Sequence, residues 1–363
     1  MTRVLVAMSG GVDSSVAAAV LAEQGHDVVG VTLKLWGGES DSGCCSVSDV
    51  DDARRAAQRL GVEHHVFNFG DDFDRHVVQP YVAAHQSGLT PNPCVECNRH
   101  IKFDKLFRRA DALGFEAVAT GHHARLVLDP GAGGVKTGPE AAAGRDVWRI
   151  ARGVDGAKDQ SYVLYMLDQS HLARLMLPIG EMTKDEVRAE AARLGLGNAA
   201  KPDSQDVCFI HSRGGRHAFL GQRIPLAPAR MVDTEGRPVG EVASVELVTI
   251  GQRRGLNLGG DDDRRYVVDI DRPAGVVTIG HRGDLLVERQ GVDQLRWSHR
   301  PVEGLLAFQC SAHGATRSGR LADEGLTVGG VTVRWDEPQP RVAAGQSIAI
   351  YQGLMVVGGG IAA

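Results

Sequence analysis

The sequence lacks any apolar run long enough to span a membrane, although 43% of its 363 residues are hydrophobic. It also lacks an excess of positive charge, because 45 acidic residues outnumber 40 Lys and Arg and leave a net charge of −5. Any surface for nucleic acid must therefore be a local basic patch. Aromatic residues make up only 5% of the chain, which leaves few platforms for stacking bases. Such a surface would depend on backbone amides and charged side chains.

A secretory signal is also missing. The first apolar run is interrupted by Ser9, Gly10 and Gly11, too early for the hydrophobic region of a signal peptide. We therefore expect a cytoplasmic protein without a membrane partner, whose six cysteines are reduced. Such cysteines are candidates for catalysis or metal binding rather than for a disulfide framework.

The first 125 residues alternate between strand-like and helix-like runs. Strands are predicted at 4–8, 28–33, 66–69 and 115–120, and helices at 14–24, 49–60, 71–85 and 101–113. This alternation predicts an α/β domain with a doubly wound parallel sheet, in which ligands bind at the carboxyl ends of the strands. Further helices are expected at 160–167 and 184–194, the second opened by a capping box of Thr183 and Glu186.

The second half of the chain has a different pattern. Residues 129–146 are rich in Gly, Ala and Pro and are expected to form an exposed loop. Beyond about residue 220, short β-rich runs alternate with turns, which predicts two smaller β-rich domains. We place three domains at residues 1–210, 211–283 and 284–363.

The turn SGGVDSS at residues 9–15 lies between the first strand and the first helix. Its glycines let backbone N–H groups approach an anion, which the N-terminus of the helix also attracts. Ser14 and Ser15 are suited to capping this helix or to binding a phosphate oxygen. The turn is neither a Walker A loop nor a dinucleotide fingerprint. Glycines alone would fit an ordinary connection, but Asp13 indicates a phosphate site in which Mg²⁺ or the helix end offsets its charge.

SGGVDSS resembles the pyrophosphate-binding loop of the ATP pyrophosphatases, which cleave ATP to AMP and pyrophosphate while adenylating a substrate. The resemblance implies that ATP and Mg²⁺ bind here, with the metal near Asp13. Leu33, in the second strand, would flank the adenine, and Gly121 in ATGHHAR would close around the nucleotide. The implied ATP-binding residues are Ala7, Met8, Ser9, Gly10, Gly11, Val12, Asp13, Ser14, Leu33 and Gly121.

Two further stretches carry cysteines. TPNPCVECN places Cys94 and Cys97 at the head of a helix rich in basic residues, where the helix end and the cations favour a thiolate. A structural zinc site would need a second Cys or His pair, which the sequence lacks. KPDSQDVCFI places Cys208 among polar residues between the two halves of the chain. The cysteines interpreted as structural are Cys44, Cys45 and Cys310.

With these stretches the chain resembles the bacterial tRNA-specific 2-thiouridylases nearly from end to end. The resemblance is carried by SGGVDSS, TPNPCVECN, ATGHHAR, KDQSYVLYML, KPDSQDVCFI, TIGQRRGL and AAGQSIAIY with a final GGGIA. It implies a sulfurtransferase that forms 2-thiouridine at the wobble position of tRNAs for Lys, Glu and Gln. It also implies a central β-rich domain that binds tRNA and a C-terminal β-barrel.

The resemblance further implies roles for single residues. The enzyme would adenylate O2 of the uridine, and Cys208 would carry a persulfide sulfur from a donor protein such as a cysteine desulfurase or a relay protein. Cys97 would be the nucleophile opposite it, and the two cysteines would end as a disulfide. The base would have to leave the stacked anticodon stem-loop. The residues implied to contact tRNA are His122, Lys158, Asp159, Gln160, Arg253, Arg254 and Gln346.

One residue departs from the family pattern. Cys94 stands where many members have an Asp that is proposed to help activate the nucleophile, which leaves the general base open. Cys94, Cys97 and Cys208 are also an alternative ligand set for a [4Fe–4S] cluster that delivers sulfide through an open iron. We favour the persulfide route. Two broader alternatives are another ATP pyrophosphatase that modifies RNA or forms amides, and a nucleotide sensor or iron–sulfur binding module.

Overall fold

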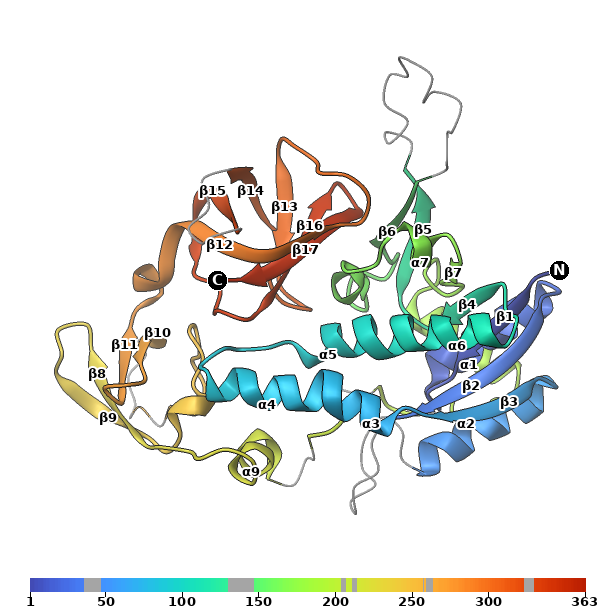
Figure 1. Ribbon diagram of the computed structural model, residues 1–363, viewed down its shortest axis with the longest axis horizontal. Coiled ribbons are helices and arrows are strands. Elements are labelled where there is room, and N and C mark those ends of the chain that lie inside the picture. The colour runs from blue at the N-terminus through green and yellow to red at the C-terminus, as the bar shows by residue number, and fades with distance from the viewer. Residues whose placement is uncertain are drawn as a thin grey trace.

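The computed structural model describes residues 1–35, 47–129, 147–203, 207–210, 214–256, 258, 264–322 and 330–363. No helix in these ranges is long and apolar enough to cross a membrane. Along the chain, an α/β part is followed by a small sheet and then by a barrel (Figure 1). Cys44 and Cys45 lie outside the described residues, as does the predicted loop at 129–146 apart from Asp129.

The first sheet has five parallel strands in the order β3-β2-β1-β4-β7. They are β1 (Arg3–Ala7), β2 (Asp27–Lys34), β3 (Glu63–Asn68), β4 (Ala117–Thr120) and β7 (Leu175–Met176). Successive residues of the central strand β1 face opposite sides, so Val4 and Val6 belong to one apolar core and Leu5 to another. Each core also contains helical residues, which confirms the predicted doubly wound α/β domain.

Helices cover both faces of this sheet. One face carries α1 (Val12–Glu23), α2 (Val47–Leu60) and α8 (Lys184–Arg193). The other carries two helical runs, α3-η1-α4 (Gly70–Phe73, Asp74–Val78, Gln79–Gln86) and α5-η2-α6 (Pro93–Glu96, Cys97–Lys105, Leu106–Ala112). In Figure 1 these two runs point from the parallel sheet toward the central β-rich part.

Two helix predictions need correction. The helix expected from residue 101 begins at Pro93, because Asn92 caps it by accepting hydrogen bonds from the N–H groups of Cys94 and Val95. The helix expected at 160–167 is only the 3₁₀ turn η4 (Ser161–Leu164), whose aromatic side chains pack against the C-terminal barrel. The other short helices are α7 (Gln169–Leu172), α9 (Gly215–Gly221), η5 (Val245–Leu247) and η6 (Arg282–Leu285).

Two β-rich parts follow, as predicted. The central sheet has the order β10-β11-β8-β9, and the C-terminal strands form a barrel in the order β12-β15-β14-β13-β16-β17, closed by pairing of β12 with β17. The strands of the central sheet are β8 (Ala229–Asp233), β9 (Pro238–Val242), β10 (Tyr266–Asp271) and β11 (Val276–Gly280). Those of the barrel are β12 (Leu286–Trp297), β13 (Leu306–Gln309), β14 (Arg317–Ala322), β15 (Val331–Pro340), β16 (Ser347–Gln352) and β17 (Met355–Ala362).

A hairpin of the first part is joined to the barrel. It consists of β5 (Ala124–Leu128) and β6 (Trp148–Arg152), and β6 pairs with β17 through Ala151 and Met355. The α/β part and the barrel therefore share one continuous sheet, which could not be foreseen from the local pattern of the chain. The domain bounds 1–210, 211–283 and 284–363 stay a prediction.

The three parts of the chain also meet at Thr90, just before the first cysteine stretch. Its N–H group donates to the carbonyl oxygen of Ala344 at 2.8 Å, and its hydroxyl donates to that of Thr249 at 3.4 Å. Gly345 has a φ of +90°, and a Cβ there would lie 2.9 Å from both the Leu89 Cβ and the Thr90 nitrogen. The motif AAGQ of the barrel is thus packed against the approach to Cys94.

We predict that Gly345→Ala will destabilise the protein more than Gly236→Ala. Both glycines have positive φ, so each alanine costs about 1–2 kcal/mol of backbone strain. At Gly236 a Cβ would meet no atom within 4 Å, whereas at Gly345 the clash adds about 1–3 kcal/mol of overpacking. Urea unfolding of both variants measures the difference, and equal losses would contradict this packing.

Candidate active site

The turn after β1 lies at the point where the strand order reverses, between the carboxyl ends of β1 and β4. Gly10 has a φ of +78°, and a Cβ there would lie 2.2 Å from the carbonyl oxygen of Asp49. Both the conformation and the space therefore require glycine. Gly11 is the N-cap of α1 and supplies no side-chain cap, so the first-turn N–H groups are left to bind an anion.

The two serines of this turn hold its shape. Ser14 Oγ accepts a hydrogen bond from the Ser9 N–H at 3.1 Å and donates to the Gly11 carbonyl at 3.2 Å. Ser15 Oγ donates to the same carbonyl at 3.0 Å, and both side chains are buried. Neither caps α1, so the helix-cap interpretation of these residues is wrong.

Asp13, in the first turn of α1, is held by Lys184 and His123. Lys184 Nζ lies 2.7 Å from one carboxylate oxygen and 2.8 Å from the other, and His123 Nε2 lies 3.2 Å from the first. Burial would raise the pKa of Asp13, but the hydrogen bonds from His123 and Lys184 outweigh it and hold that pKa below its usual range. The expected counter-charge was Mg²⁺ or the helix end. Asp13 lies at the N-terminal end of α1, and the ammonium group of Lys184 adds a counter-charge that was not expected.

The same ammonium group binds a second carboxylate. Lys184 Nζ lies 2.8 Å from Asp203, which also pairs with Lys158 Nζ at 2.8 Å and with the Arg188 guanidinium at 3.1 Å. Burial would raise the pKa of Asp203, but the hydrogen bonds from Lys158 and Lys184 lower it to about 2. Asp203 therefore remains charged, five residues before Cys208.

The segment that leads to Cys208 is also fastened to the glycine turn. Asn198 Nδ2 donates to the Gly10 carbonyl at 3.1 Å and to Ser15 Oγ at 3.0 Å. Lys201 Nζ lies 2.6 Å from Asp49 and 3.4 Å from the Gly10 carbonyl. The structure thus brings the predicted phosphate turn and the approach to the predicted persulfide cysteine into one network.

Several residues of this network were not among the predicted site residues, including Lys184, Asn198, Lys201 and Asp203. Lys201 and Asp203 belong to the stretch that the sequence singled out for its cysteine, and their charge in that stretch was the available signal. Lys184 appeared only as the residue after a helix cap, and a capping box does not indicate where the next side chain points. Its partner Asp13 is 171 residues away in the chain.

The end of β4 lies against the same turn. A Cβ on Gly121 would lie 2.5 Å from the backbone nitrogen of Ser14, so a glycine is required there. His122 is only 7% exposed, stacks on Phe103, and shares a 2.8 Å hydrogen bond between its Nδ1 and Thr120 Oγ1. Burial, helped by the charge of a nearby lysine, lowers the pKa of His122 to about 3. A neutral buried ring offers no charge to a tRNA phosphate.

The remaining predicted ATP contacts lie at the carboxyl ends of β1 and β2. The Met8 N–H donates to the Val31 carbonyl at 2.8 Å, and the buried Thr32 hydroxyl donates to the Met8 carbonyl at the same distance. Leu33 is 7% exposed and lies opposite Phe67 of β3. Residues 7–14 and Gly121 therefore lie together, with Leu33 on the neighbouring strand.

The three residues of the KDQ motif, Lys158, Asp159 and Gln160, have different hydrogen-bond partners. Lys158 pairs with Asp203, as described above. Asp159 is buried, where it accepts hydrogen bonds from Arg152 at 2.6 Å and from the Ser161 hydroxyl at 2.9 Å. Gln160 is exposed, but its side-chain oxygen accepts from the His123 N–H at 2.9 Å. Asp159 thus supports the junction with the barrel, where the Arg152 guanidinium also lies over the Tyr351 ring.

No disulfide joins the cysteines in the described part of the chain. Cys94 is exposed in the first turn of α5, whereas Cys97 is buried at the start of η2. Cys208 is partly buried against the same apolar core as Cys97. Cys310 is buried in the barrel, and burial raises the pKa of its thiol to about 11, as expected of a structural cysteine.

The described part of the chain contains no group of three or more His, Cys, Asp or Glu side chains that could hold a metal ion. The three cysteines therefore do not form the ligand set of an iron–sulfur cluster in this arrangement. Both carboxylate oxygens of Asp13 are engaged by Lys184.

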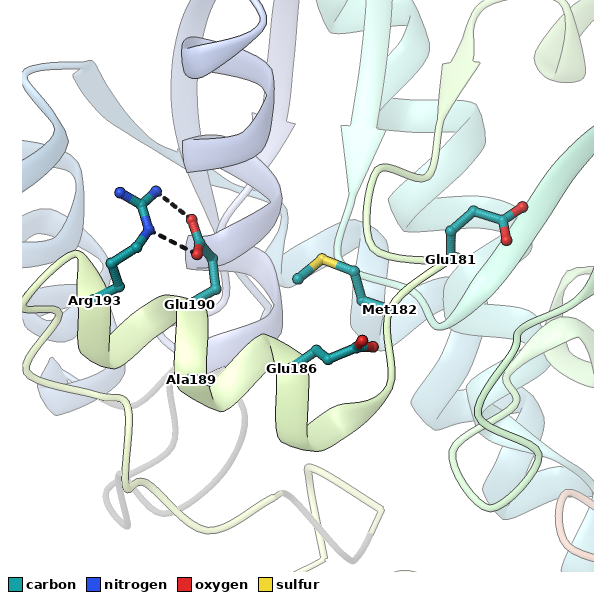
Figure 2. A pocket seen from close by; sticks show the side chains of 6 residues that line it. All are labelled: Glu181, Met182, Glu186, Ala189, Glu190 and Arg193. Atoms are coloured by element: carbon teal, nitrogen blue, oxygen red, sulfur yellow. Dashed lines mark hydrogen bonds and ion pairs between the residues drawn. The ribbon is translucent and has the colours of Figure 1, made fainter.

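The last three predicted tRNA contacts lie outside the α/β part. Arg253 and Arg254 are exposed in the turn that follows Thr249, and Gln346 is partly exposed in the turn that packs against Thr90. The structure therefore places the two turns that carry them on either side of Thr90. A separate open depression on α8, shown in Figure 2, carries acidic residues that are already engaged: Glu186 caps the helix and Glu190 binds Arg193.

We predict that His122 makes the fold acid-labile. Its folded pKa of about 3 lies below the ordinary value of 6.5, so the unfolded chain binds the extra proton between these two pH values. Stability is therefore lost as the pH falls below 6.5, by up to about 1.4 kcal/mol per pH unit. His122→Gln should reduce the slope of stability against pH in urea unfolding at pH 7.5 to 4.5, while the part that comes from His85, whose pKa is lowered to about 4, remains. A His122 ring that titrates near 6.5 by NMR would contradict the assignment.

A second prediction concerns Asp159. Asp159→Ala should destabilise the protein by about 3–5 kcal/mol, because Arg152 would keep a largely buried charge without its partner. Asp159→Asn should cost less, since it retains the hydrogen-bonding shape. Urea unfolding without tRNA measures this, with Asp233→Ala as a control in an exposed ion pair. Unchanged stability with weaker tRNA binding would mean that Asp159 is an RNA contact instead.

Comparison with known proteins covers all three parts of the chain. Residues 2–212 match a family model described as tRNA methyl transferase HUP domain, and residues 217–281 match one described as tRNA methyl transferase PRC-barrel domain. Residues 293–362 match an Aminomethyltransferase beta-barrel domain. Among solved structures, the U34-tRNA thiolase NcsA from Methanococcus maripaludis with its [4Fe-4S] cluster is 20% identical, with 61% of this chain and 63% of that chain covered and a TM-score of 0.36. That likeness is too low to bear on function.

Curated relatives match the whole length. The chain is 44% identical over 372 residues to a tRNA-specific 2-thiouridylase MnmA from Roseiflexus castenholzii, with 99% of each chain covered. It is 44% identical over 364 residues to a protein of the same name from Thermobifida fusca, with 98% of this chain and 94% of the relative covered. On these matches, the chain belongs to the tRNA-specific 2-thiouridylase family.

Proposed function

We propose that this protein is a tRNA sulfurtransferase that uses ATP to replace O2 of the wobble uridine by sulfur in tRNAs for Lys, Glu and Gln. One observation carries the proposal furthest. The residues that approach Cys208 are bound to the glycine turn directly and to Asp13 through Lys184, so a nucleotide in that turn would lie beside the segment that delivers sulfur. The names of the full-length relatives support the same activity.

The turn supplies what ATP requires. The first-turn N–H groups of α1 and the positive end of the helix would hold the phosphates. Mg²⁺ would enter with ATP as part of the substrate, coordinated by phosphate oxygens and water, and would lie near Asp13. The buried edges of β1 and β2, with Leu33, would lie beside the adenine.

The chemistry has two halves. In the first, O2 of the uridine attacks the α-phosphorus of ATP, pyrophosphate leaves, and the N3 proton is lost. In the second, the outer sulfur of a Cys208 persulfide attacks C2, and AMP leaves with the former O2. The Cys97 thiolate then attacks Cys208 Sγ, which breaks the S–S bond, frees the thiocarbonyl and leaves a Cys97–Cys208 disulfide. A thiol reductant reopens this disulfide, and a cysteine desulfurase or relay protein restores the persulfide.

Thiolation is favoured over methyl transfer, which the family-model descriptions mention. Methyl transfer does not require a pyrophosphate-binding loop, because it does not cleave ATP to AMP and pyrophosphate. The paired roles of Cys97 and Cys208 fit sulfur transfer instead. The cluster route is not favoured, because Cys94 is exposed while Cys97 is buried, and the described residues form no metal-holding group.

The tRNA would lie across all three parts. The turns that carry Arg253 and Gln346 flank Thr90, so an anticodon stem-loop that contacts them would reach the approach to Cys97. The basic residues of η2 and α6 would add phosphate contacts, and Lys158 lies beside the predicted ATP site. Such a reaction belongs in the cytoplasm, where tRNA and ATP are available.

The direct test is thiolation of unmodified tRNA(Glu) by purified protein with ATP, Mg²⁺ and a sulfur source. Retardation in a mercury-containing gel measures the product. We expect Cys97→Ser and Cys208→Ser to lose activity by about 10³-fold or more, because each removes a sulfur that forms a bond in the reaction. Cys310→Ala is the matched control, since its thiol is buried in the barrel and should leave activity unchanged.

Cys94→Ser and the presence of air separate the two sulfur routes. Activity in air that Cys94→Ser retains supports the persulfide route. Activity that requires strict anaerobiosis and is lost in all three variants of Cys94, Cys97 and Cys208 would favour the cluster. No thiolation by the wild-type protein under either condition would contradict the proposed function.

A further inference from the structure

Lys184 is a nearly buried cation at an electrostatically unusual place. It is 7% exposed and occupies the first position of α8, while its partner Asp13 occupies the first turn of α1. The positive ends of two helices, of 12 and 10 residues, therefore meet at an ammonium group. Helix N-termini disfavour cations, so the arrangement depends on the two carboxylates that Lys184 shares, Asp13 and Asp203.

The proposed adenylation builds up negative charge at this place. As O2 of the uridine attacks the α-phosphorus, the bond from that phosphorus to the bridging oxygen of the β-phosphate breaks. The electron pair of that bond goes to the leaving pyrophosphate. A cation already positioned there would stabilise the transition state without having to reorganise. Lys184 Nζ is hydrogen-bonded to a residue of the phosphate turn itself, at 2.7 Å.

The other lysines near the turn are less suited to this role. Lys201 pairs with Asp49 and Asp52 on the side where α2 covers Gly10. The Lys158 side chain is 38% exposed and binds Asp203 but makes no hydrogen bond to Asp13 among the described contacts. Of the three lysines, Lys184 is the one whose ammonium group binds both Asp13 of the turn and Asp203 of the segment that leads to Cys208 among the described contacts.

We propose that Lys184 is a further residue of the ATP site, whose ammonium group binds the pyrophosphate leaving group, and that Asp203 is the positioning residue that holds it there. The inference rests on the proposed function. On arrival of the phosphates, Lys184 exchanges its contact with Asp13 for one with a phosphate oxygen. It keeps its contact with Asp203, which Lys158 and Arg188 hold from the other side.

The test follows pyrophosphate release that depends on tRNA, with ATP varied, so that the step is seen apart from sulfur transfer. Lys184→Met should lower kcat for pyrophosphate release by about 10²- to 10³-fold. Lys184→Arg should recover part of the loss, because it keeps the charge in another shape. Arg193→Met is the matched control, since it removes a cation at the other end of α8. Arg193 pairs with Glu190 (Figure 2) and also with Glu23, both on the surface.

Asp203 provides a second measurement should Lys184→Met fail to fold. Asp203→Asn should raise the KM for ATP and lower kcat, each several-fold, and Asp203→Glu should restore much of both. A purely structural role would lower the melting temperature without changing KM and kcat of the folded fraction.

The outcomes separate the two proposals. A folded Lys184→Met with the pyrophosphate release of the wild type, or an Asp203→Asn with unchanged KM and kcat, would overturn the inference and leave the proposed function intact. A wild-type protein that releases no pyrophosphate with tRNA would overturn both. A specific loss in Lys184→Met and Asp203→Asn, with Arg193→Met unaffected, supports the inference.

Discussion

One ammonium group is shared between two carboxylates that come from distant parts of the sequence. Lys184 binds Asp13 in the glycine turn and Asp203 in the segment before Cys208, and it is nearly buried in doing so. Without this cation the carboxylates of Asp13 and Asp203 would repel each other. The network that joins the turn to the cysteine segment would then lose the residue that links its two halves. The proposed nucleotide site and the proposed sulfur site are thus linked by charge as well as by the chain.

The main contribution of the two β-rich parts is to hold the segment before Cys94 and Cys97 in place. The hairpin β5–β6 continues the barrel sheet, and Thr90 touches both the central part and the barrel. The approach to Cys94 and Cys97 is therefore fixed by residues from all three parts. Such a framework suits a large substrate that must present one base to a buried thiol, because the distant contacts can orient the body while the local residues act on the base.

Much of the fold could be predicted from local patterns. Alternating runs indicated the doubly wound sheet, and β-rich runs with turns indicated the two following parts. The helix expected from residue 101 begins at Pro93, because Asn92 caps it and proline suits its first position. The 3₁₀ turn at Ser161 replaced an expected helix because its tyrosines bind the barrel, at Ser347 and Gly360.

The site was predictable where one motif contains all the partners, as in the glycine turn. It was not predictable where partners are far apart in the chain. Lys184 meets Asp13 across 171 residues, and no local pattern records that contact. The family resemblance implied that Asp159 contacts tRNA. In the structure its buried carboxylate binds Arg152, and its neighbour Ser161 is hydrogen-bonded to Tyr351, which lies 190 residues further along the chain.

The central claim is that ATP chemistry on the base and sulfur chemistry at the cysteines are successive steps at one site. Incubation of Cys208→Ser, which can carry no persulfide, with tRNA(Glu) and ATP labelled in the α-phosphate tests it most directly. The account predicts a single turnover in which label appears on the tRNA and pyrophosphate is released, with no 2-thiouridine formed. Absence of label from the tRNA, with a wild-type protein that thiolates normally, would contradict the account.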